Sequence, residues 1–191
     1  MNTDINTINS RFDETLTVLS KIKQEQTELI NEIAKIFTQA FKSGNKLLIC
    51  GNGGSAADAQ HIAAEFIGKF YKIDRPALPA IALNTNTSII TAIGNDFGYE
   101  MTFSRQVEGL GQKGDIFTAI STSGNSINAV EAAKIAKEKG MKVISFTGEG
   151  ESKLSEISDI TIKVPSKNTP IIQNAHIAIL HIICEIVENK F

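Results

Sequence analysis

The sequence predicts a single α/β domain in which a central parallel sheet is flanked by helices on both faces, with further helices at the N-terminus. Its 191 residues suffice for one domain with a sizeable core. Short apolar runs alternate with longer stretches of helical periodicity, which is typical of parallel strands joined by helices. The apolar runs are almost uninterrupted, as strands covered on both faces require.

The segment from about residue 9 to 43 is expected to be helical, because its apolar residues recur three or four positions apart. Gly44 is the expected C-cap of this helix. The recurring apolar residues are Phe12, Leu16, Leu19, Ile22, Leu29, Ile33, Ile36, Phe37 and Phe41.

Strands and helices then alternate to the C-terminus. Strands are expected at residues 46–50, 80–83, 115–120, 142–147 and 159–164. Helices are expected at residues 56–70, 99–110, 127–140 and 170–189. A further helical stretch is expected after the strand at 80–83 and ends at about residue 93. In such folds ligands bind outside the carboxyl ends of the strands, so the loops that follow strands are the expected place for a site.

The composition excludes several classes of protein. No apolar run approaches the ~18 residues that span a bilayer, and the polar N-terminus does not resemble a signal peptide. Two cysteines without a CxxC motif fit a reducing compartment, so we expect a cytoplasmic protein that does not bind membranes. The net charge of −2 and the lack of a basic block argue against nucleic acid as a partner.

Two loops that follow strands are rich in Ser and Gly and lead directly into helices: residues 51–55 (GNGGS) and 121–126 (STSGNS). Glycine lets the backbone approach a ligand, and the first N–H groups of a helix are unpaired and lie at the positive end of its dipole. Hydroxyl groups add donors, so the loops predict a phosphate cradle. The hydroxyl residues are Ser55, Ser121, Thr122, Ser123 and Ser126.

Each loop also has other interpretations. For either loop alone, simple helix capping explains the serines equally well, but two such loops at adjacent strand ends favour binding. Gly51-x-Gly53-x-x-Ala56 matches the dinucleotide fingerprint, yet no acidic residue follows the second strand, and a Walker GK[ST] is missing. We therefore expect no nucleotide cofactor.

His61 and Glu65 lie four residues apart in the helix after the first loop, which places them on one helix face. A solvated face with an ordinary i,i+4 contact is the alternative. The surrounding residues are small and apolar, which favours a general base.

The final helix carries Gln173, His176 and His181 in an apolar run. A single histidine there is more often a hydrogen-bonded core residue than a catalyst. Gln173 and His181 are separated by about 12 Å along the helix, which suggests long side-chain reach or a site near a subunit interface.

Four stretches together resemble the SIS (sugar isomerase) domain family, and within it the phosphoheptose isomerases: CGNGGSAADAQH (50–61), AIGNDFGYE (92–100), AISTSGNS (119–126) and IIQNAHIAILH (171–181). The resemblance covers nearly the whole chain. It implies one SIS domain over residues 1–191, with an N-terminal helical segment (1–43) used in oligomerisation and an α/β core (44–191).

The resemblance also implies an activity. An aldose–ketose isomerase of this family converts sedoheptulose 7-phosphate to D-glycero-D-manno-heptose 7-phosphate through a cis-enediol, at the start of nucleotide-activated heptose synthesis for lipopolysaccharide core or capsule. The implied assembly is a homotetramer with active sites near subunit interfaces. The implied cofactor is one zinc ion per subunit, and the implied partner is a phosphorylated seven-carbon sugar.

The family's site residues carry over position by position. Its metal ligands fall on His61, Glu65, Gln173 and His181. Its substrate contacts fall on Asn52, Gly53, Gly54, Glu65, Asn95, Asp96, Ser121, Thr122, Ser123, Ser126 and Gln173, and Ser55 belongs to the same loop. Lys69 stands where many members have Arg, which keeps the charge but not the fork geometry.

We expect Glu65 to be the base at carbon and His181 the acid/base at oxygen. Whether Glu65 is a base or a zinc ligand stays open. Two other functions fit parts of the sequence. SIS proteins that bind the replication initiator DnaA lack the carboxylate and imidazole, so Glu65 and His181 favour an enzyme. An isomerase of another sugar phosphate stays open, because the cradle binds phosphate whatever the chain length.

Overall fold

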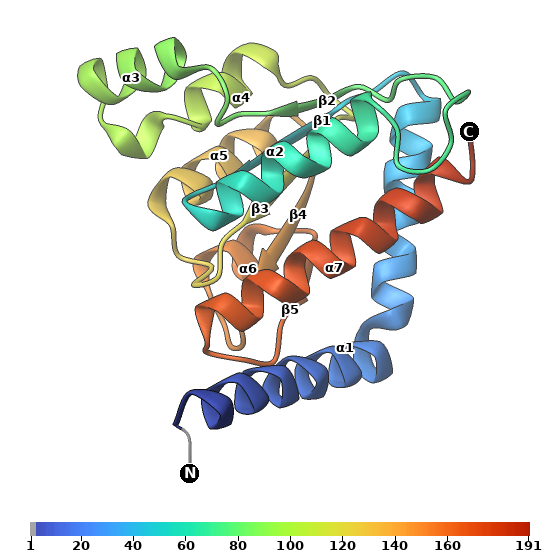
Figure 1. The fold of residues 1–191 in the computed structure, drawn as a ribbon. Helices are drawn as coiled ribbons and strands as arrows, with labels where there is room; N and C mark the ends of the chain where they lie inside the picture. Colours follow the sequence, from blue (N-terminus) through green and yellow to red (C-terminus); the bar gives the residue numbers. More distant parts are fainter. Residues whose placement is uncertain (1–2) are drawn as a thin grey trace.

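Five strands form one parallel sheet at the centre of the protein (Figure 1). The computed structural model describes residues 3–191. Every neighbouring pair is parallel, and the order is β2-β1-β3-β4-β5. The predicted sheet is thus confirmed. The strands are β1 (Leu47–Gly51), β2 (Ala80–Ala82), β3 (Ile116–Ile120), β4 (Lys142–Thr147) and β5 (Ile160–Lys163).

Helices cover both faces of this sheet, as predicted. Along β1, Leu47 and Ile49 join the core formed with α1, α2 and α7, whereas Leu48 and Cys50 join the core formed with α4, α5 and α6. The helices are α1 (Thr3–Lys42), α2 (Gly54–Ile67), α3 (Thr87–Asp96), α4 (Ser104–Leu110), α5 (Ile127–Glu138), α6 (Lys153–Ile157), α7 (Thr169–Glu188) and the short 3₁₀ helix η1 (Tyr99–Met101).

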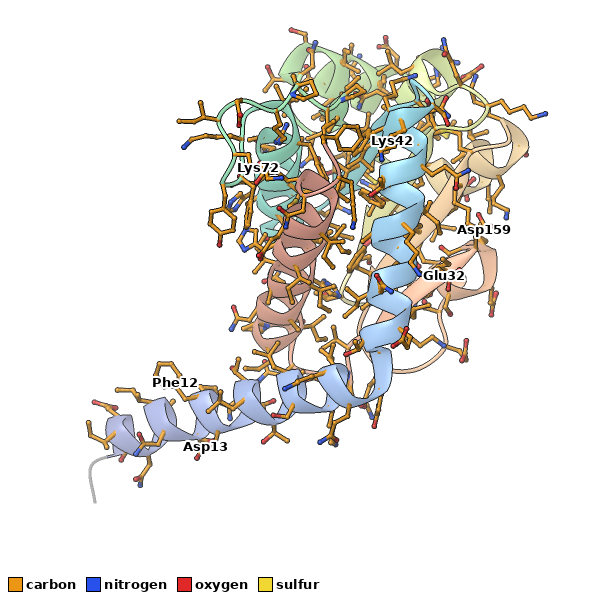
Figure 2. The ribbon with its side chains drawn as sticks, turned by 90° about the vertical axis from the view of Figure 1, so that its right-hand side faces the viewer. Phe12, Asp13, Glu32, Lys42, Lys72 and Asp159 are labelled. Atoms are coloured by element: carbon orange, nitrogen blue, oxygen red, sulfur yellow. The ribbon has the colours of Figure 1, made fainter. Side chains whose placement is uncertain are left out.

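The N-terminal helix α1 is longer than predicted, and it bends (Figure 2). Its second half, with Ile33 and Phe37, is buried against the body. Its first half projects outward and leaves Phe12 67% and Leu16 62% exposed. The apolar residues that predicted the helix therefore form two surfaces. The surface on the second half of α1 packs within this chain, and the one on the first half is exposed.

Gly44 ends α1 as predicted, with φ of 79°. The amide of Gly44 donates to Phe41 O (3.1 Å) and that of Asn45 donates to Ala40 O (3.0 Å). These two bonds satisfy carbonyls that the helix end leaves free.

Two local predictions were wrong. Gly94-Asn95-Asp96 forms the last turn of α3 instead of a loop, because the amide of Phe97 still donates to Ile93 O (2.9 Å). The helix expected at residues 99–110 is divided into η1 and α4. The short helix α6 was not predicted, and a Ser152–Ser155 capping box begins it.

Among the described residues, α7 is the one helix long and apolar enough to cross a membrane by length and composition. Half of its apolar window is buried within the protein, where it packs against α1 and α2. The core helix of a globular domain meets the same criteria.

His176 lies on the buried side of α7 and is fully buried. Its Nε2 lies 3.0 Å from Thr147 O, and its Nδ1 is buried without a partner. Burial lowers the pKa of His176 from 6.5 to about 4, although the hydrogen bond to Thr147 opposes the change. His176 is therefore a neutral core residue.

We predict that the stability of the fold falls as the pH drops from 6.5 towards 4. The unfolded chain binds a proton at His176 near pH 6.5, whereas the folded chain resists it to about pH 4, which is worth about 3 kcal/mol at most. Urea unfolding of wild type and His176→Gln at several pH values measures this. The variant should show the shallower pH dependence, and equal slopes would contradict the prediction.

Candidate active site

The two Ser/Gly loops meet at the carboxyl edge of the sheet. The first joins β1 to α2, and the second joins β3 to α5. Because β1 and β3 are neighbours and parallel, both loops leave the same edge side by side. Ser55 is buried in the first turn of α2.

The hydroxyl groups of the second loop cluster together. Ser121 Oγ lies 2.9 Å from Ser126 Oγ and 3.5 Å from Ser123 Oγ. Ser126 occupies the N-cap position of α5 but makes no side-chain capping bond. The Ser126 hydroxyl therefore does not cap α5, and phosphate binding by this loop stays a prediction.

The two loops are joined through Asn52, which was predicted, and through Asn128 and Tyr99, which sequence reasoning missed. The side-chain amides of Asn52 and Asn128 exchange two hydrogen bonds of 2.9 and 3.0 Å. The Tyr99 hydroxyl, from η1, lies 3.1 Å from Asn52 Oδ1. Asn128 is the second residue of α5, two positions after the STSGNS loop. Nothing in the local sequence distinguishes it from any other helical residue.

His61, Glu65 and His181 form a second cluster, between α2 and α7. His61 Nε2 lies 3.0 Å from Glu65 Oε1 and 3.3 Å from His181 Nε2. The predicted i,i+4 pair therefore shares one face, and α7 brings His181 to it across 120 residues of sequence.

The three side chains have too few hydrogen atoms for both contacts of His61 Nε2 to be hydrogen bonds at once. A neutral imidazole nitrogen carries at most one hydrogen, so His61 Nε2 cannot donate to Glu65 and also accept from His181. Burial, and then His61, lower the pKa of His181 below its usual value, while Glu65 raises it. His181 is thus neutral near pH 7, suited to exchanging protons with a ligand.

Gln173 lies at the other end of this helix pair. A Cβ at Gly54 would meet Gln173 Nε2 at 2.6 Å, so the amide rests directly on the start of α2. The structure therefore joins three of the four predicted metal ligands and places the fourth at the Ser/Gly loops, about 12 Å along α7 from His181.

The other predicted residues lie further apart. Asn95 and Asp96 are exposed at the end of α3, where Asn95 Nδ2 donates to Asp96 Oδ1 (2.7 Å). Thr122 and Ser123 line a cavity of about 250 Å³ beside the start of α7. Lys69 is exposed in the loop after α2.

Asp58 is a further residue that the sequence did not single out. It lies one turn before His61 on α2, and its Oδ2 is buried without a hydrogen-bond partner. Burial raises the pKa of Asp58, and His61 opposes this. Asp58 therefore places a second carboxyl group close to His61.

The zinc ligation expected for His61, Glu65, Gln173 and His181 stays a prediction. Within residues 3–191, no three or more His, Cys, Asp or Glu side chains are already arranged as a metal centre. Two imidazole nitrogens and a carboxylate oxygen do meet in this cluster, and these are donor types that bind zinc.

The parallel sheet and the paired hydroxyl-rich loops define the class of protein, a SIS domain. The model of the SIS domain family matches residues 12–148.

Individual relatives extend the match. A phosphoheptose isomerase of Aneurinibacillus thermoaerophilus is 50% identical over 96% of each chain, and one of Aliarcobacter butzleri is 51% identical over 90% of each. The structure of a phosphoheptose isomerase from Francisella tularensis superimposes with a TM-score of 0.95 at 36% identity, covering 98% of this chain and 99% of that one. The chain belongs to the phosphoheptose isomerase family and is an isomerase.

The contact between Gly54 and Gln173 gives a direct test of the site. We predict that Gly54→Ala pushes the Gln173 amide away and lowers kcat/KM by roughly 10- to 100-fold, since a displacement near 1 Å can cost that much. The melting temperature should change little, because the obstructing group is the end of a flexible side chain.

Gly109→Ala is the matched control. Gly109 is exposed in α4, and a Cβ there meets nothing within 4 Å. Full activity in both variants would show that Gln173 need not rest on Gly54.

Proposed function

We propose that the protein is a cytoplasmic aldose–ketose isomerase that converts sedoheptulose 7-phosphate to D-glycero-D-manno-heptose 7-phosphate, the first step towards nucleotide-activated heptose. The observation that supports this best is the contact of His61 with both Glu65 and His181, beside two hydroxyl-rich loops. The names of the relatives support a heptose phosphate as the substrate.

The loops anchor the phosphate in this proposal. The backbone N–H groups at the starts of α2 and α5 and the hydroxyls of Ser121, Ser123 and Ser126 supply the donors. The sugar then extends along α2 and α7 towards the histidines.

The proton transfers fall to the second cluster. Glu65 removes a proton from C1, which gives a cis-enediol, and returns it to C2. His181, neutral near pH 7, takes the proton of the C1 hydroxyl and passes it to the C2 oxygen. Each positioned transfer contributes roughly 10²–10⁴-fold.

The spacing of the two clusters supports a long sugar. His61 lies roughly 10 Å along α2 from Gly54, at 1.5 Å per residue. When a shorter sugar phosphate is anchored by the same loops, its carbonyl stops about 1.3 Å further from the histidines for each carbon removed.

We propose that His61, Glu65, Gln173 and His181 hold one zinc ion per subunit, with Gln173 contributing through long side-chain reach or from a second subunit. Imidazole and carboxylate groups are common zinc ligands, whereas an amide is unusual. Bound zinc polarises a carbonyl as a Lewis acid.

We predict that the purified protein isomerises sedoheptulose 7-phosphate faster than ketopentose or ketohexose phosphates, and that sedoheptulose without phosphate is a poor substrate. Each sugar is assayed with and without chelator, and chelation should lower the rate of isomerisation because it removes the proposed zinc ion. Faster turnover of a shorter sugar phosphate would contradict the heptose assignment.

Two variants test the roles in this assay. Glu65→Gln and His181→Gln should each lose at least about 100-fold in kcat while remaining folded. Glu138→Gln, on the exposed side of α5, is the control and should be fully active. Near-normal turnover by either variant at the cluster removes that residue from the mechanism.

We propose that the protein is a homotetramer held together through α1. Four apolar side chains on its projecting half are 50–67% exposed and follow helical spacing: Ile5, Ile8, Phe12 and Leu16. An apolar cavity of about 530 Å³ lies between α1 and α7 and includes Ile22, Ile30 and Ile182. Exposed apolar patches of this kind mark interaction surfaces.

We predict that Phe12→Glu combined with Leu16→Glu reduces the mass of the assembly, as measured by light scattering after size-exclusion chromatography. Asp13→Asn, on the same exposed half of α1, should leave the assembly unchanged. An unaltered mass in the double variant would rule out this stripe as the interface.

A further inference from the structure

A single buried carboxylate, at the last residue of α7, holds the loop that follows α2. The side chain of Glu188 is 3% exposed. Its Oε1 accepts from Phe70 N at 2.9 Å and Arg75 Nε at 2.8 Å. Its Oε2 accepts from Tyr71 N at 2.7 Å and Lys72 N at 3.1 Å.

These four donors keep Glu188 ionised. Burial alone raises the pKa of the carboxyl, but the N–H groups of Tyr71 and Phe70, then the Arg75 guanidinium and the Lys72 N–H, bring it down to about 2. The carboxylate is thus charged and fully bonded at any pH at which the protein works.

Arg75 faces the other way, towards α2, and its side chain is 1% exposed. Its Nη1 donates to Phe66 O and Pro76 O at 2.8 Å, and its Nη2 donates to Glu65 O at 2.5 Å. Carbonyls at the end of a helix lack partners within the helix and attract a cation. Arg75 therefore caps α2 at the residue that carries the proposed base.

The loop held by Glu188 also contacts the proposed acid/base. The Phe70 ring lies 5.7 Å from the His181 ring, and the His61 ring lies 4.8 Å from it on the α2 side. His181 is thus in contact with His61 and with a loop residue whose amide is fixed by Glu188.

We propose that the buried Arg75–Glu188 pair is a positioning device that fixes Glu65 and His181 relative to one another. Arg75 acts through the backbone of Glu65, and Glu188 acts through Phe70. This inference rests on the roles proposed above for Glu65 and His181. Neither member of the pair needs to touch the substrate.

Two conservative variants test the proposal. Glu188→Gln keeps the shape but loses the charge and half of the acceptor capacity. Arg75→Lys keeps a charge but cannot reach several carbonyls at once. In each variant we expect kcat to fall roughly 10- to 100-fold. KM should change less than about twofold, since the phosphate loops lie at the opposite ends of α2 and α7.

Asp115→Asn is the matched control. Asp115 is also buried, and it accepts from Lys46 N (3.0 Å), Lys46 Nζ (2.5 Å) and Gln112 N (2.8 Å). It lies at the amino edge of the sheet, away from the site. Its loss should reduce stability with kcat unchanged. An equal fall of kcat in Asp115→Asn would mean that general destabilisation explains the effect.

A readout that is independent of activity separates this inference from the proposed function. The chain has three histidines, so the ring protons of each can be assigned by NMR. In metal-free protein, the His181 resonance, shifted by the ring current of Phe70, should move in Glu188→Gln and Arg75→Lys but not in Asp115→Asn. An unmoved His181 resonance, or unchanged kcat, in both folded variants would overturn the proposal. Failure of wild type to isomerise the heptose phosphate, with the resonance still moving, would count against the proposed function alone.

Discussion

The site depends on the parallel packing of α2 against α7. Both helices follow strands of one parallel sheet and lie on the same face, so both run back along the strands in the same direction (Figure 1). Their starts therefore lie together, with Gly54 against Gln173, and two turns later His61 meets His181. The apolar core beneath them, including Ile62 and Ile183, holds this register.

This arrangement separates anchoring from chemistry. The helix starts and the hydroxyl cluster of Ser121 and Ser126 present neutral hydrogen-bond donors, a kind of group that suits an anion. The Asn52–Asn128 amide pair joins the two loops, so they form one preorganised surface. The titratable groups lie further along the same helices. In the proposed function, a substrate anchored at the loops extends along these helices towards His61 and His181.

The sequence predicted most of what periodicity and local chemistry control. All five strands, the Gly44 cap and the faces of α2 appear within one or two residues of their expected places. The failures have specific physical causes. The end of α3 depends on a backbone bond from Phe97 N to Ile93 O, which residue type alone does not predict. The role of Asn128 depends on a partner 76 residues away, and that of Glu188 on one 113 residues away. Local spacing carries no information about such pairs.

The choice of a buried ion pair at Arg75 and Glu188 is itself informative. Removing two charges from water costs free energy that their attraction often does not recover, so such a pair is weak evidence for stability. An apolar contact would join α2 and α7 at less cost, but it has no direction. The Arg75 guanidinium and the Glu188 carboxylate make seven hydrogen bonds in total, if the bond between them is counted once. Together these bonds define both the position and the orientation of the segments they join. The need for fixed orientation at Glu65 and His181 gives this pair a physical reason to lie where it does.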